Sequence, residues 1–327
     1  MRSLIMKIVV GFMLYGCVAS ANIVENEDIQ SFIEEMVSKH GFDKAELSEL
    51  ISHAKVSDTI LEAISRPAEE LPWYRYRPIF LKPERVRLGV EFMKKQQAVL
   101  AKAEQAYGVP PEIITAIIGV ETRYGSNTGG YRVIDSLVTL AFHYPKRAGF
   151  FRSELEQFLL LTREQSLDPR EVTGSYAGAM GITQFISSSY RNYAVDFDID
   201  GKTDIWHDPA DAIGSVANYF KMHGWERGEQ IAFRARAEGQ RYLQIAEGGQ
   251  APDIRVGDLA GYGVYPDTSL DPDTMVKLLR FETKDGDELW IGLKNFYVIT
   301  RYNHSPLYAM AVFQLSREIL NLYNSES

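Results

Sequence analysis

Residues 110–125 read PPEIITAIIGVETRYG, an apolar stretch with a carboxylate near its end. Because proline favours the first turn of a helix and glycine favours its end, the stretch predicts a helix over 112–124 that Gly125 stops. One face of this helix is apolar, at i, i+3 and i+4 spacing: Ile114, Ile117 and Ile118. Glu121 follows at i+7, so we expect it to be at least partly buried. Burial raises the pKa of a carboxyl, as a general acid near neutral pH requires, but the spacing alone leaves open a solvent-facing Glu121 paired with Arg123.

A second carboxylate is not evident beside Glu121. The nearest downstream acid is Asp135, which we expect to cap a helix over 136–142. Glycoside hydrolysis ordinarily uses a pair of carboxylates that flank the scissile bond. If Glu121 acts alone in such chemistry, the nucleophile has to come from elsewhere, for example from the substrate.

Composition sets the broad class of the protein. The chain has 327 residues, of which 45% are hydrophobic and 24% charged, so it can bury a sizeable core as one large or two modest domains. Its formal net charge of −9 argues against nucleic acid as a partner. The lone Cys17 cannot close an internal disulfide or build a structural zinc site, so any metal has to use oxygen ligands.

The N-terminus is typical of an exported protein. Arg2 and Lys7 precede an apolar run over 8–18, which is too short to span a bilayer but suits a signal peptide. We expect a signal peptide over residues 1–21, ending in Ala-Ser-Ala, and a soluble periplasmic protein. The alternative is an outer-membrane lipoprotein attached through Cys17.

Residues 22–108 predict an N-terminal helical region. Asp43 and Glu46 are spaced as a capping box. The Pro- and aromatic-rich stretch 72–78 should interrupt helix formation and act as a packed connector, and a long helix should follow over 83–107.

The rest of the chain predicts an α+β fold that is mainly α. Residues 109–228 alternate helices with Gly-rich turns, and 229–300 form a small β-containing subdomain with a hairpin turn at Asp285-Gly286. The C-terminal segment 301–327 contains a last helix, over about 309–323, and should return to the core.

Four ordered segments resemble the lytic murein transglycosylases of the B type: 118–125 (IGVETRYG), 175–185 (SYAGAMGITQF), 211–220 (DAIGSVANYF) and 295–303 (NFYVITRYN). The resemblance covers a frame from about Trp73 to Leu320. It implies a lysozyme-like helical core that cleaves the β-1,4 bond between N-acetylmuramic acid and N-acetylglucosamine in peptidoglycan. Glu121, at the position of the family's single acid, would protonate the leaving oxygen and then accept the proton of the muramoyl C6 hydroxyl. A 1,6-anhydromuramoyl end results without a second carboxylate.

The resemblance also implies substrate contacts at matching positions. These are Ser175, Gln184, Tyr219, Tyr302, Asn303 and Tyr308, together with the basic pair Lys146 and Arg147 facing substrate carboxylates. Without the resemblance, the aromatic residues would be read as core and the basic pair as solvated surface.

An Asp-rich loop follows the opening of an EF-hand, with oxygens at positions 1, 3 and 5 and Gly201 at position 6. Position 12 is His207, where the standard loop has a glutamate. The resembling family closes its loop later, which implies the calcium ligands Asp196, Asp198, Asp200, Lys202 (through its backbone carbonyl) and Asp211. The calcium would be structural, and the chemistry would need no cofactor. The alternative is an Asp-rich turn without metal.

Two other functions stay open on the sequence. One is a hydrolase on the same fold, in which water attacks; the other is a non-catalytic wall-binding or calcium-dependent adhesion protein. We expect a monomer whose partner is the peptidoglycan glycan strand.

Overall fold

The computed structural model describes residues 26–65 and 71–326. Two compact units, Met1–His53 and Ala54–Ser327, make up the chain. The predicted signal peptide and Cys17 lie outside the described residues. Within the described ranges, no helix is both long and apolar enough to cross a membrane.

The first unit holds two helices, α1 (Glu27–His40) and α2 (Lys44–Ser52). One of the two hydrogen bonds of the expected capping box is present: Asp43 Oδ1 accepts a 2.9 Å hydrogen bond from the Glu46 N–H. The apolar faces of both helices are buried: Ile29, Phe32, Ile33, Met36, Leu47 and Ile51. The region predicted over 22–108 is therefore divided between the two units.

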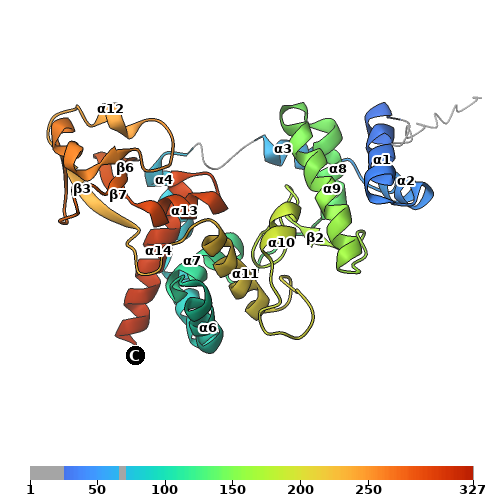
Figure 1. The fold of residues 1–327 in the computed structure, drawn as a ribbon, viewed down its shortest axis with the longest axis horizontal. Helices are drawn as coiled ribbons and strands as arrows, with labels where there is room; N and C mark the ends of the chain where they lie inside the picture. Colours follow the sequence, from blue (N-terminus) through green and yellow to red (C-terminus); the bar gives the residue numbers. More distant parts are fainter. Residues whose placement is uncertain (1–25, 66–70, 327) are drawn as a thin grey trace, which may run out of the picture. The chain divides into compact units, whose positions relative to one another are not determined.

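Helices dominate the second unit (Figure 1). They are α3 (Asp58–Ile64), α4 (Trp73–Phe80), α5 (Pro83–Lys95), α6 (Gln97–Tyr107), α7 (Pro111–Thr122), α8 (Val133–His143), α9 (Ala148–Glu164), α10 (Ser187–Tyr193), α11 (Pro209–Met222), α12 (Leu243–Ala246), α13 (Lys294–Tyr302) and α14 (Pro306–Ser325). The central helix is α7, which contacts α5, α6, α11 and α14. Because neighbours surround it, its apolar residues from Ile113 to Val120 are buried on all sides.

A five-stranded antiparallel sheet forms the β-containing subdomain. Its order is β4 (Ile254–Arg255), β6 (Met275–Thr283), β7 (Gly286–Gly292), β3 (Ala232–Ala237) and β5 (Val264–Pro266). Thr283 pairs with Gly286 across a two-residue loop. The predicted hairpin is therefore confirmed, but its turn is at Lys284-Asp285, one residue earlier than predicted. A separate short ladder joins β1 (Tyr131–Arg132) to β2 (Thr173–Gly174).

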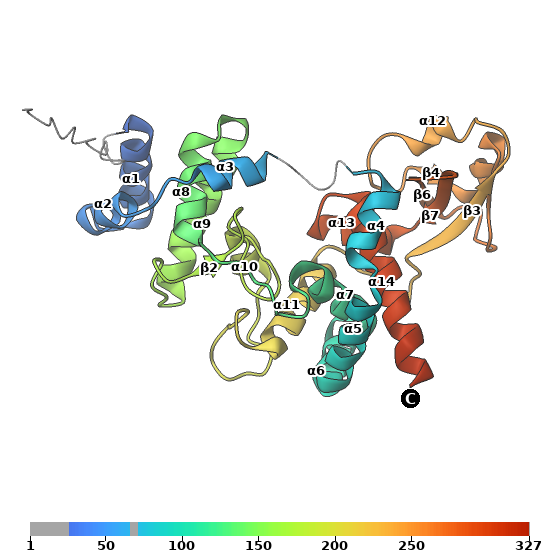
Figure 2. The same ribbon diagram turned by 180° about the vertical axis from the view of Figure 1, so that it is seen from behind.

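Helix α4 contradicts the expectation that residues 72–78 interrupt helix formation. The helix runs through Pro78. Trp73 and Tyr76 are buried on one side of it, and the Trp73 ring lies 5.2 Å from the ring of Phe281 on β6. Helix α4 contacts both β6 and α14, and Figure 2 shows it beside them. Tertiary packing of the aromatic rings thus outweighs the hydrogen bond that Pro78 cannot donate.

Two further expectations were wrong in detail. The helix expected over 83–107 is broken at Gln96 into α5 and α6. Asp135 does not cap a helix, because α8 already begins at Val133; it instead accepts a 2.9 Å hydrogen bond from the Lys55 N–H and pairs with Arg132 at 2.7 Å.

Candidate functional site

Glu121 lies in the last turn of α7 and is half-buried. Its Oε1 accepts a 2.6 Å hydrogen bond from the phenol of Tyr308, which lies 187 residues away on α14. Burial raises the pKa of Tyr308 well above its ordinary value, and the charge of Glu121 acts in the same direction. Tyr308 therefore stays protonated at neutral pH and serves as a fixed donor to the carboxylate.

The chain turns sharply just after this carboxylate. Helix α7 ends at Thr122, and both Arg123 and Tyr124 adopt left-handed conformations, with φ of 49° and 61°. Tyr124 then folds back over Gly119, where a Cβ atom would lie 2.6 Å from the Tyr124 hydroxyl. Gly119 is required because a side chain there would collide with this ring.

A tight turn over residues 174–185 faces the end of α7. Ser175 Oγ accepts hydrogen bonds from the N–H groups of Ala177 and Ala179, at 3.3 and 3.1 Å. Thr122, fully buried, donates its hydroxyl to the Ile182 carbonyl at 3.1 Å. This bond fixes the turn against the residue next to Glu121.

Gln184 belongs to the same turn and has a left-handed φ of 52°. Its amide Nε2 donates to the carbonyls of Thr128 and Gly181, both at 3.0 Å. The side chain predicted to contact sugar thus also ties the loop after α7 to the turn.

Two tyrosines of the predicted set brace the same region from α11 and α13. Tyr302 donates to the Thr183 carbonyl at 2.6 Å, and Tyr219 donates to the Arg301 carbonyl. Their ring centroids are 4.9 Å apart. Burial raises the pKa of both phenols, so both remain neutral donors.

The remaining predicted contacts lie elsewhere. Asn303 is half-buried in the turn between α13 and α14. Lys146 and Arg147 belong to an exposed 3-10 helix that leads into α9. The Arg147 guanidinium lies 4.3 Å from the ring centroid of Phe150. The structure therefore unites Glu121, Tyr308, Tyr302 and the 174–185 turn, and leaves the basic pair on a separate element.

Three of the predicted metal ligands converge in the Asp-rich loop. Carboxylate oxygens of Asp196, Asp198 and Asp211 all lie within 4.8 Å of one another. Asp211 is 1% exposed, and its two oxygens accept hydrogen bonds of 2.7 Å from the N–H groups of Phe197 and Asp204. Burial raises the pKa of Asp211, and the neighbouring charges of Asp208 and Asp198 add to the effect.

The other two predicted ligands, Asp200 and Lys202, lie in the same loop. The Asp200 carboxylate accepts from the Lys202 N–H at 2.9 Å, and both residues are exposed. Together the five residues could offer only oxygen ligands, which are the ligands that Ca²⁺ prefers.

The contacts of Thr122 and His223 were not predicted from the sequence. Thr122 also accepts a 3.0 Å hydrogen bond from the Gly125 N–H and so holds the turn after α7. In the sequence, the position of Thr122 next to Glu121 could have indicated this role. The His223 ring stacks on the Tyr219 ring with their centroids 4.0 Å apart. His223 is the C-cap of α11, four residues after Tyr219, and this spacing could have indicated the contact.

The geometry supports proton transfer by one carboxyl. Glu121 is half-exposed, oriented by a neutral phenol, and next to a turn rich in small residues.

Comparison with known proteins identifies relatives over most of the chain. Residues 25–317 match the model of the transglycosylase SLT domain. The chain is 45% identical to membrane-bound lytic murein transglycosylase B of Escherichia coli over 316 residues, which cover 91% of this chain and 84% of that protein.

Solved structures agree with this assignment. The catenated lytic transglycosylase SltB1 from Pseudomonas aeruginosa is 50% identical, with a TM-score of 0.87 over 91% of this chain and 98% of that chain. The Escherichia coli lytic transglycosylase Slt35 in complex with calcium is 46% identical, with a TM-score of 0.85 over 92% and 95%. SltB3 from Pseudomonas aeruginosa in complex with NAG-anhNAM-pentapeptide is 31% identical, with a TM-score of 0.77 over 90% and 79%. The predicted α+β, mainly α fold is confirmed, and the chain belongs to the SLT-domain lytic transglycosylases.

Proposed function

We propose that Glu121 is the single acid and base of a peptidoglycan lytic transglycosylase. The observation that carries the proposal is the 2.6 Å hydrogen bond from Tyr308, which orients a half-buried carboxyl at the end of α7. A general acid has to be held at a fixed place relative to the bond that it protonates. A glutamate that merely paired with Arg123 on the surface would not need a buried phenol from another helix.

The reaction divides into two proton transfers by the same group. Glu121 first protonates the glycosidic oxygen that leaves N-acetylmuramic acid, while positive charge develops at C1. The ionised carboxylate then accepts the proton of the C6 hydroxyl as that oxygen closes on C1. The attacking oxygen belongs to the same sugar, which gives the step a high effective molarity and removes the need for a second carboxylate.

Substrate contacts follow from the side chains around Glu121. The turn that carries Ser175 and Gln184 allows close approach of the sugar, because its neighbours are Gly and Ala. Tyr302 and Asn303, which are both half-buried, would offer a ring face and polar atoms to the glycan. Tyr219 and Tyr308 are buried and would support the site from behind, through their hydrogen bonds to the Arg301 carbonyl and to Glu121. Lys146 and Arg147 would meet carboxylates of the peptide or lactyl groups, with Arg147 supplying the bidentate fork that Lys146 lacks.

The matched test is Glu121→Gln against Glu112→Gln, since both residues lie on α7 and both substitutions remove one charge. We expect Glu121→Gln to slow the clearing of purified sacculi roughly a thousandfold while glycan binding persists. Glu112→Gln should clear sacculi at the wild-type rate. Unchanged clearing by Glu121→Gln would refute the assignment.

Calcium binding is a second element of the proposal. Asp196, Asp198, Asp200 and Asp211 would offer carboxylate oxygens, and Lys202 its backbone carbonyl. The close approach of the Asp196, Asp198 and Asp211 carboxylates supports it, because a divalent cation would offset their mutual repulsion. The ion would brace the loop between α10 and α11 and take no part in the proton transfers.

Calcium titration during thermal unfolding tests this element. At a free calcium concentration of 100 times Kd, binding adds about 2.7 kcal/mol to the unfolding free energy. We expect Asp211→Asn to lose this stabilisation and the exposed control Asp267→Asn to keep it. A wild-type melting temperature that does not respond to calcium would contradict the site.

We infer a monomer exported to the periplasm, as the predicted signal peptide indicates. Incorporation of labelled palmitate, compared with Cys17→Ala, distinguishes the soluble form from an outer-membrane lipoprotein. Sedimentation of the mature chain tests the oligomeric state.

A further inference from the structure

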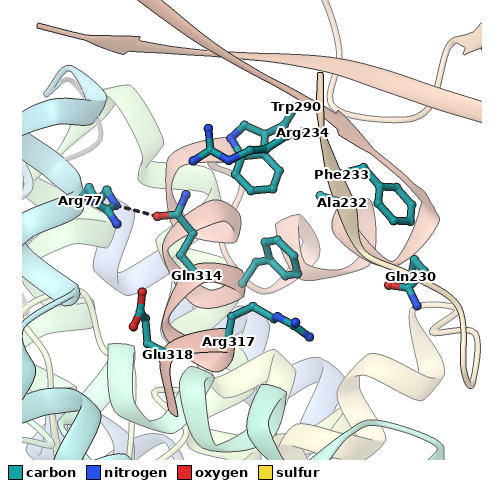
Figure 3. Close-up of a pocket in the computed structure, with 10 residues that line it drawn as sticks. Arg77, Gln230, Ala232, Phe233, Arg234, Trp290, Gln314, Arg317 and Glu318 are labelled. Atoms are coloured by element: carbon teal, nitrogen blue, oxygen red, sulfur yellow. Dashed lines mark hydrogen bonds between the residues drawn. The ribbon is translucent and has the colours of Figure 1, made fainter. Parts of the chain in front are cut away.

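A cavity lies on the far side of α14 from Glu121. Its volume is about 430 Å³, and it is an open cavity bordered by α4, α14 and the strands β3 and β7 (Figure 3). Its lining includes three arginines from three different elements: Arg77, Arg234 and Arg317. We call this cavity the arginine pocket.

The pocket is separate from the proposed active site. Tyr308 and Arg317 are nine residues apart on α14, and at about 100° per residue they face opposite sides of the helix. Tyr308 contacts Glu121, whereas Arg317 lines the pocket. A ligand in the arginine pocket therefore would not occupy the site of bond cleavage.

An aromatic wall supports one of the arginines. The Arg234 guanidinium lies 4.8 Å from the ring centroid of Trp290, and the Phe313 ring meets Trp290 edge-on at 5.9 Å. A guanidinium stacked in this way keeps its N–H edge available for a planar anion. Its Nη2 also forms a 3.6 Å salt bridge with Glu288, a residue outside the pocket lining, so the rest of the guanidinium edge is what a ligand would meet.

The other two arginines, Arg77 and Arg317, add positive charge on the side of the pocket opposite Trp290. Arg77 Nε donates to Gln314 Oε1 at 2.7 Å, which is a neutral partner. Arg317 forms no hydrogen bond or salt bridge with any described residue, although its charge lowers the pKa of Glu112. Figure 3 shows Arg317 across the pocket from Trp290, with Arg77 and Gln314 directed toward each other. Glu318 is the one acid that lines the pocket.

We propose that the arginine pocket binds the terminal carboxylate of a short peptide. Three guanidinium groups and one carboxylate give the lining an excess of positive charge in a chain of net charge −9. Guanidinium forks match a carboxylate bidentately, and Trp290 with Phe313 offers apolar surface to the peptide side chains. This inference rests on the proposed function in one respect: peptides attached to the glycan strand would supply the carboxylate and add a second point of attachment.

Direct binding tests the pocket without any catalysis. Calorimetry would use the full chain, a synthetic tetrapeptide with a free C-terminal carboxylate, and the same peptide with a C-terminal amide. We expect the amide, and the variants Arg317→Gln and Arg234→Gln, each to weaken binding about tenfold. Arg236→Gln is the matched control, because Arg236 lies on β3 two residues beyond Arg234, outside the pocket lining.

Cleavage gives the second readout. Arg317→Gln should raise KM for peptide-bearing glycan strands, leave kcat unchanged, and not alter the cleavage of peptide-free strands. Peptide binding should persist in Glu121→Gln, so failure of the pocket and failure of the proposed catalytic role remain distinguishable. Equal binding of acid and amide, or equal binding by Arg317→Gln and Arg236→Gln, would overturn the proposal.

Discussion

The two ends of α7 carry the same kind of residue in two different situations. Glu112 in the first turn and Glu121 in the last are both half-buried glutamates, nine positions apart. Burial raises the pKa of Glu112, although its own backbone N–H and the charge of Arg317 act in the opposite direction. Glu121 instead receives a phenol hydrogen bond from α14 and faces the 174–185 turn.

Burial by itself therefore does not distinguish the proposed catalytic acid, Glu121, from Glu112. The N-terminal end of a helix stabilises a negative charge, and the C-terminal end disfavours it. A carboxylate at the C-terminal end of α7 needs a donor from another element, and Tyr308 supplies it. The difference between the two ends predicts that substitutions at Glu121 and its partners affect rate, whereas those at Glu112 affect stability.

Removal of the Tyr308 hydroxyl should give the largest effect after loss of Glu121 itself. Tyr308→Phe keeps the ring but deletes the donor, so we expect kcat to fall roughly 10- to 100-fold. Tyr323→Phe, in the last turn of the same helix, is the control and should retain wild-type kcat. Initial rates on purified glycan strands measure both, and equal rates for Tyr308→Phe and wild type would show that orientation by Tyr308 is unimportant.

A methyl group at Gly119 should disturb the turn after Glu121. Its Cβ would lie 2.6 Å from the Tyr124 hydroxyl, which donates to the Arg85 carbonyl at 2.8 Å, so the ring has to move. We expect Gly119→Ala to lower the unfolding free energy by about 1–3 kcal/mol. Gly149→Ala, in the helix α9 with nothing within 4 Å, should raise it by up to about 1 kcal/mol. Urea unfolding measures the unfolding free energy of both variants. A Gly119→Ala variant as stable as wild type would contradict the close packing of Tyr124 over Gly119.

Glu112→Gln should have the smallest effect, and its sign depends on pH. Because the pKa of Glu112 is higher in the folded state than in the unfolded chain, its ionisation destabilises the fold as pH rises from the unfolded value through the folded one. We expect the variant to be more stable than wild type at pH 7 by under about 1 kcal/mol, with no gain at acid pH, where the residue is protonated in both states. Urea midpoints across pH measure this, and a loss of stability at pH 7 would contradict the account.

The sequence predicted local structure where pattern and capping agree. The helix over 112–124 was recovered as α7 with its end two residues early, because Arg123 and Tyr124 enter left-handed conformations that only the packing over Gly119 explains. The hairpin and the last helix were also predicted. Glu121 could be singled out because an acid stood on an apolar face.

Long-range contacts could not be predicted from the sequence. The bond between Tyr308 and Glu121 joins residues 187 positions apart, and the α4 helix depends on Trp73 reaching Phe281. Asp135 looked like a helix cap, but its partner Lys55 lies 80 residues away. Periodicity and capping rules describe neighbours along one element, whereas these residues are fixed by elements that only the fold brings together.

Mass spectrometry of the soluble products released from purified sacculi tests the central claim most directly. Wild type should release muropeptides that are lighter by one water than hydrolytic products, because the C6 oxygen of the sugar replaces water as the acceptor. Glu121→Gln should release almost none of them, and Glu112→Gln the same products as wild type. Reducing-end products from the wild-type chain, or anhydro products from Glu121→Gln at the wild-type rate, would contradict a single glutamate acting as both acid and base.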